Sequence, residues 1–170
     1  MSAPCFIAWA ADTSAATGPP TAVASSATSG TVKTILQLKT GAGKIRIIEW
    51  GYTLDSVPAA PLRVEIVETG TIFATVTTLG SGVRSYNDVT GAATQTAAAG
   101  TAATGFNASA EGTITASRLF GYQYENGIYF KQQFPLGREP EVNAASALRI
   151  RVTPTTSVAV NIMPYIIWEE

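Results

Sequence analysis

Apolar and polar residues alternate with a period of two through most of this chain. The clearest alternations cover residues 32–39, 62–66, 72–76, 148–152 and 158–162. A period of two places successive side chains on opposite faces of an extended strand, so these segments are predicted to be half-buried β-strands. No segment repeats apolar residues at the i, i+3, i+4, i+7 spacing of an amphipathic helix, which favours an all-β fold.

The alternation is interrupted in two predicted strands, residues 44–55 and residues 32–39. Between residues 44 and 55 the apolar positions change from odd numbers, Ile45 and Ile47, to even numbers that begin with Ile48. A strand keeps one face buried only if its period is unbroken, so a β-bulge is predicted at Ile47–Ile48. Ile35 is the exception to the alternation of residues 32–39.

Turn residues indicate how the strands are connected. Thr69-Gly70 predicts a tight turn that joins residues 62–66 and 72–76 in a hairpin. Asn126-Gly127 is the strongest hairpin signal of the chain and predicts a second hairpin across residues 119–134. About eight or nine strands without a βαβ unit predict an antiparallel two-sheet sandwich, a jelly roll.

The chain is predicted to form one domain, residues 31–170, with an extended N-terminal arm, residues 1–30. The arm is rich in Ala, Thr and Ser, and Pro19-Pro20 is incompatible with a helix there. Inside the domain, residues 80–112 are mostly Gly, Ala and Thr and predict a long loop of small residues.

Composition favours a protein that covers its surface with other proteins. Hydrophobic residues make up 46% of the chain and charged residues only 14%, so much of the surface is neutral and dissolves poorly by itself. The net charge is −1 and the Lys and Arg residues lie singly along the chain, which argues against nucleic-acid binding. We also expect no membrane span and no signal peptide, and therefore synthesis in a cytoplasm without export by that route.

The residue types needed for most catalytic and metal sites are scarce. The chain has no histidine and one cysteine, Cys5, which excludes a Ser-His-Asp triad and a Cys/His zinc site. Asp55 and Asp88 are the best calcium candidates, although the chain lacks an Asp-x-Asp-x-Asp run. We therefore expect no enzyme, no catalytic residue, no cofactor and no catalytic metal.

Aromatic side chains supply the candidate contact residues. Phe6 and Trp9 are the predicted anchors of the arm, and Phe106 is the predicted anchor of the long loop. Trp168 lies in an apolar alternation and is interpreted as a core or interface anchor. The candidate interface therefore comprises Phe6, Trp9, Phe106 and Trp168.

Tyr122 and Tyr124 form an alternative candidate site. They share one strand face beside the Asn126-Gly127 turn. If exposed, the two rings would form a platform for a glycan. Cross-strand packing inside a hairpin is the other interpretation of the same pattern.

Four segments of the chain carry a resemblance to known proteins. They are Lys44-Ile-Arg-Ile-Ile-Glu-Trp-Gly51, Ala110-Glu-Gly-Thr-Ile-Thr-Ala-Ser-Arg118, Gln133-Phe-Pro-Leu-Gly-Arg138 and Tyr165-Ile-Ile-Trp-Glu-Glu170. In these segments the chain resembles the small jelly-roll decoration, or cement, proteins of tailed bacteriophages, and the similarity covers most of residues 31–170 in strand order.

The resemblance implies a structural role on the outer surface of a phage capsid. It implies a homotrimer that binds the major capsid protein and uses a terminal arm, here residues 1–30, to do so. No catalytic site is implied. Two alternatives remain open: a carbohydrate-binding module or host-surface adhesin, and a capsid protein whose jelly roll itself forms the shell.

Overall fold

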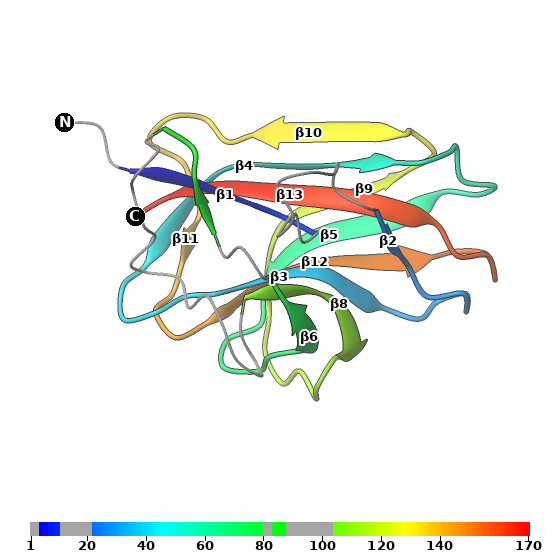
Figure 1. The fold of residues 1–170 in the computed structure, drawn as a ribbon, viewed down its shortest axis with the longest axis horizontal. Coiled ribbons are helices and arrows are strands. Elements are labelled where there is room, and N and C mark those ends of the chain that lie inside the picture. The colour runs from blue at the N-terminus through cyan, green and yellow to red at the C-terminus, as the bar shows by residue number, and fades with distance from the viewer. Residues whose placement is uncertain (1–3, 11–21, 80–82, 88–103) are drawn as a thin grey trace.

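The computed structural model describes residues 4–10, 22–79, 83–87 and 104–170. These residues form two antiparallel β-sheets that pack face to face, and they contain no helix (Figure 1). The all-β prediction is confirmed. The strands are β1 (Cys5–Trp9), β2 (Val23–Ala24), β3 (Lys33–Lys39), β4 (Ile45–Leu54), β5 (Leu62–Glu68), β6 (Thr75–Thr78), β7 (Arg84–Ser85), β8 (Gly105–Ala110), β9 (Arg118–Glu125), β10 (Tyr129–Gln133), β11 (Glu141–Val142), β12 (Ala147–Pro154) and β13 (Asn161–Glu169).

The strand order is that of a jelly roll. The seven-stranded sheet has the order β10-β4-β13-β1-β7, with β11 on β4 and β2 on β13, and the six-stranded sheet has the order β6-β8-β3-β12-β5-β9. Among the eight main strands in chain order, β1 pairs with β13, β3 with β12, β4 with β10, and β5 with β9. The first of these eight strands therefore pairs with the last, the second with the seventh, and so on inward. This is the pattern of one long antiparallel ribbon rolled into a sandwich.

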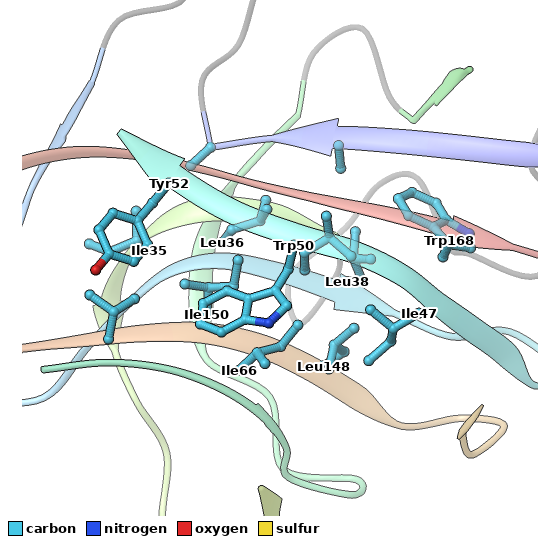
Figure 2. Packing of buried hydrophobic residues seen from close by; sticks show 14 of the residues in the cluster. Ile35, Leu36, Leu38, Ile47, Trp50, Tyr52, Ile66, Leu148, Ile150 and Trp168 are labelled. Atoms are coloured by element: carbon cyan, nitrogen blue, oxygen red, sulfur yellow. The ribbon is translucent and has the colours of Figure 1, made fainter. Parts of the chain in front are cut away.

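The inner faces of the two sheets enclose one hydrophobic core. Trp50 reaches from β4 toward Ile66 and Ile150 on the facing sheet (Figure 2). Gly121 lies against the same tryptophan, because a Cβ at this position would come within 2.9 Å of the Trp50 ring. The absence of a side chain at Gly121 therefore lets β9 close one side of the sandwich.

Both interruptions of the alternation are bulges. The pairing of β4 with β13 shifts register between Glu49 and Ile47, so Ile48 is the extra residue and the predicted bulge is confirmed. The pairing of β3 with β12 also shifts, with Ile35 as the extra residue. Ile35 and Leu36 are consequently both buried in the core.

Neither predicted hairpin forms. Gly70 does turn the chain, with a φ of 57°, but β5 then pairs with β12 and β9 and not with β6. β9 and β10 lie in different sheets, where they pair with β5 and β4. A type I′ turn needs positive φ at both central residues, and neither Asn126 nor Gly127 is among the described residues with positive φ. The connection instead crosses between the sheets.

The predicted arm and long loop are partly built into the sandwich. β1 is hydrogen-bonded between β13 and β7, and β2 pairs with β13, so residues 5–9 and 23–24 belong to the domain. Residues 105–110 form β8 between β3 and β6. Residues 11–21, 80–82 and 88–103 lie outside the described residues.

Candidate interaction surface

Exposed apolar side chains lie on the last strand of each sheet and on the connection between these two strands. Tyr129 of β10 projects from the outer face of the seven-stranded sheet, and Tyr122 and Tyr124 of β9 project from the outer face of the six-stranded sheet. β10 is the last strand of the seven-stranded sheet, β9 is the last strand of the six-stranded sheet, and three residues join them (Figure 1). We call this the β9–β10 surface. It comprises Leu119 (55% exposed), Tyr122 (44%), Tyr124 (53%), Ile128 (50%) and Tyr129 (57%).

The two tyrosines of β9 project from the outer face of the six-stranded sheet. Tyr122 lies opposite Glu65 and Tyr124 lies opposite Arg63 on β5, while Val64 between them is fully buried in the core. The Arg63 Nε donates a hydrogen bond of 3.2 Å to the Tyr122 hydroxyl. The structure therefore places both rings on one exposed face, side by side with polar groups.

β9 also presents an open strand edge. Of the described strands only β5 pairs with it, so its other edge carries backbone N–H and C=O groups without a strand partner. The strand contains no proline and no lysine, and its charged residues, Arg118 and Glu125, stand at its two ends. Natural edge strands are commonly protected by such residues, and the middle of β9 has none.

The structure moves two of the four predicted interface residues into the core. Phe6 is 1% exposed and Trp168 is 0% exposed, and their ring centroids lie 6.0 Å apart between the sheets. This corrects their assignment as contact residues. The physical reason is that β1 joins the sheet, so the inner-facing positions of β1 and β13 both turn toward the six-stranded sheet.

The other two predicted interface residues are half-buried. Trp9 packs against Tyr165 on the outer face of the seven-stranded sheet, with ring centroids 4.9 Å apart. Phe106 lies on β8 and packs against the core beside Leu36. Neither lies on the β9–β10 surface. That surface includes Tyr122 and Tyr124 but none of the four residues first assigned to the interface.

Leu119 and Ile128 were not singled out from the sequence. The alternation identifies which positions share a face of a strand. Whether that strand lies at the edge of its sheet depends on the order of the strands, which the alternation does not give. The apolar residues between Leu119 and Tyr124, interrupted by Gly121 and Gln123, were the available signal.

One buried carboxylate holds the start of β9 in place. Glu68 on β5 accepts hydrogen bonds from Arg118 Nε at 2.8 Å, Ser146 Oγ at 2.8 Å and the Asn143 backbone N–H at 3.0 Å. Burial alone would raise the pKa of Glu68, but these bonds from Ser146, Asn143 and Arg118 lower the pKa below its ordinary value. Beside Glu68 and Arg118 lies an open hollow of about 400 Å³, whose only charged lining groups are this ion pair.

Changing Glu68 to glutamine is expected to lower the free energy of unfolding by about 2 kcal/mol at neutral pH, because charged hydrogen bonds are lost. The folded protein binds the Glu68 proton less tightly than the unfolded chain does. This stabilisation is therefore complete above the ordinary pKa of about 4.3 and disappears as pH falls through the lower folded value. Urea denaturation at a series of pH values should show the gap between wild type and variant closing in acid.

Glu65→Gln is the matched control, because Glu65 is on the same strand and pairs with Arg151, but its side chain is 22% exposed whereas that of Glu68 is 5% exposed. A gap for Glu68→Gln that stays constant into strong acid would contradict the assignment.

The described residues show no grouping typical of a metal site. No three or more acidic or cysteine side chains gather within them. Asp55 stands at a strand end without such neighbours, and Asp88 lies outside the described residues. In this part of the chain there is also no helix long and apolar enough to cross a membrane.

Comparison with known proteins identifies no relative. No family model matches the chain, and no curated protein matches it. Among solved structures, the chain is similar to the VP2 subviral particle of infectious bursal disease virus, with 12% identity, 97% of this chain and 41% of VP2 covered, and a TM-score of 0.24. The proposals that follow therefore rest on the fold and surface of this chain.

Proposed function

We propose that this protein is a structural virion protein that decorates and stabilises the outer surface of a phage capsid. It does so by associating with copies of itself, as a homotrimer, and by binding the major capsid protein. The observation that carries the proposal is the β9–β10 surface, the exposed apolar side chains on two open edge strands and on the connection between them.

Three further features support this role. The jelly roll is complete, so the exposed apolar residues are not needed to close its core. Only 14% of the chain is charged, which suits a surface that is covered in an assembly. Apolar burial contributes roughly 25 cal/mol per Å², so a modest contact repeated over a shell, and made several times by each oligomer, stabilises it strongly.

The test measures mass and shell binding separately. Sedimentation equilibrium of the pure protein should give three copies of 17.7 kDa, about 53 kDa. Shells assembled from the major capsid protein of the same virus should bind the chain and melt at a higher temperature. A protein that leaves the shells unchanged at saturating concentration would contradict decoration, and closed particles formed by the pure chain would instead assign it to the shell itself.

A carbohydrate-binding role is the second candidate. It is favoured by the two exposed rings of Tyr122 and Tyr124 beside Arg63 and Glu65, since aromatic faces and nearby hydrogen-bonding groups are what a sugar ring needs. Retention on immobilised glycans that disappears in Tyr122→Ala and Tyr124→Ala would assign this role.

A further inference from the structure

We propose that β9 pairs with β9 of a second copy of this chain, in antiparallel orientation about a two-fold axis through Gln123. The two six-stranded sheets then become one continuous sheet. The inference rests on the self-association in the proposed function and names one surface that makes it. A two-fold contact cannot close a trimer, so it joins neighbouring trimers to each other, and the mass of the pure protein should rise from about 53 kDa toward multiples of that mass as its concentration increases.

The first argument is the edge itself. β9 is eight residues long, its outer backbone groups are open, and an exposed apolar strand of this kind is a template for another strand. The edge is also well positioned before any partner arrives. Arg118 holds its start to Glu68, and Gly121 seats its middle against Trp50.

The second argument is charge. β9 begins with Arg118 and ends with Glu125. Parallel pairing of two copies would set Glu125 beside Glu125 and Arg118 beside Arg118. Antiparallel pairing about Gln123 sets Glu125 opposite Gly121 and keeps each Arg118 beside its own Glu68, so only this orientation avoids like charges in contact.

The third argument is the spacing of the tyrosines. The pairing of β9 with β5 shifts register at Phe120, so Gly121–Glu125 is the regular segment and Gln123 is its midpoint. With the axis at Gln123, Tyr122 of each copy faces Tyr124 of the other, on the same face of the sheet. Directly opposed aromatic residues stabilise antiparallel pairs, and this register gives two such pairs.

The neighbouring registers are less suitable. Directly opposed residues of an antiparallel pair point to the same face, so the axis must pass through a residue. An axis at Tyr122 or at Tyr124 opposes that tyrosine with its own copy and gives one tyrosine pair, whereas the axis at Gln123 gives two.

A disulfide tests the axis directly. In a Cys5→Ser background, which removes the only natural thiol, Gln123→Cys places two thiols opposite each other at a separation that a disulfide spans. Mild oxidation should convert most of this variant to a covalent dimer. Ile128→Cys in the same background is the control, because Ile128 is 50% exposed but lies far from the axis, and its crosslinking should be at least tenfold slower.

A charged substitution tests the same axis without a covalent crosslink. Gln123→Lys sets two like charges against each other and should weaken association at least tenfold in sedimentation equilibrium, while Gln123→Ser should change it far less. Association that is unchanged by lysine, with no crosslinking at position 123, overturns the pairing and leaves self-association to another surface. Wild type that stays monomeric at every concentration overturns both the pairing and the self-association.

Shell binding and glycan retention distinguish the remaining cases. Crosslinking at position 123 without any binding to shells supports the pairing and contradicts decoration. Retention on immobilised glycans that is lost in Tyr122→Ala, with a mass that is unchanged by Gln123→Lys, assigns the tyrosines to a glycan and overturns the pairing.

Discussion

Changing Trp168 to alanine is expected to lower the free energy of unfolding by about 3–5 kcal/mol, the usual range for a buried tryptophan. Trp168 is fully buried in the core (Figure 2), with its ring centroid 6.0 Å from that of Phe6 on the neighbouring strand. Its removal leaves a cavity that the closely packed strands can fill only in part. Denaturation with urea, followed by tryptophan fluorescence and circular dichroism, measures the loss.

Trp9→Ala is the matched control for this substitution. Trp9 lies on β1, next to β13, but its ring packs on Tyr165 at the outer face and remains partly exposed. We expect a loss of about 1–2 kcal/mol, in line with partial burial. A Trp168→Ala protein as stable as wild type, with weakened shell binding only, would return Trp168 to the interface.

The sequence predicted the faces of the strands better than their neighbours. Period-two alternation identified the inner positions of β5 and β12, and the change of period at Ile48 predicted a bulge that the structure contains. The reason is physical, because alternation is a local consequence of one face being buried. The bulge at Ile35 is likewise visible in the sequence, as the exception to the alternation of residues 32–39.

The pairing of the strands was harder to predict from the sequence, because turn residues determine only the local path of the chain. Asn126-Gly127 favours a hairpin, but in this fold the two flanking strands gain more by pairing with β5 and β4 in separate sheets. Alternation also could not decide whether Phe6 and Trp168 are core or interface residues, because a protein core and a protein interface both exclude water. Only the insertion of β1 between β13 and β7 decides it.

Arg149 shows that the period-two alternation does not predict burial on the outer face of a sheet. The alternation places it outward on β12, and it does lie opposite Val67 and Gln37 on the outer side of the six-stranded sheet. It is nevertheless 0% exposed. Residues 72–74 and Glu111 cover it, and nothing in the period of β12 indicates that cover.

A network of polar contacts fixes this cover to the sheet. Arg149 Nη1 donates to the Glu111 backbone oxygen at 2.9 Å and contacts its carboxylate at 3.3 Å, and Nη2 donates to the Ile72 backbone oxygen. The Thr34 hydroxyl donates to the same carboxylate at 2.6 Å. Burial lowers the pKa of Arg149, and the nearby Glu111 opposes that shift. The guanidinium therefore depends on these partners.

Changing Arg149 to methionine is expected to lower the free energy of unfolding by about 3–5 kcal/mol, because the Glu111 carboxylate and the Ile72 carbonyl lose a partner that water cannot readily replace. Arg151→Met is the control. Arg151 lies on the same strand and face in a pair with Glu65, but both side chains retain some exposure, so we expect about 1 kcal/mol.

The double variant Arg149→Met with Glu111→Gln distinguishes the interaction energy of the ion pair from the cost of changing each residue alone. Removing both charges leaves no unpaired ion, so the combined loss should be smaller than the sum of the two single losses by about 1–3 kcal/mol. Strict additivity, or a loss for Arg149→Met no larger than that for Arg151→Met, would show that the cover is held by packing alone. If the coupling is found, the ion pair between Arg149 and Glu111 contributes to holding residue 111, and with it the cover over β12, on the outer face of the six-stranded sheet.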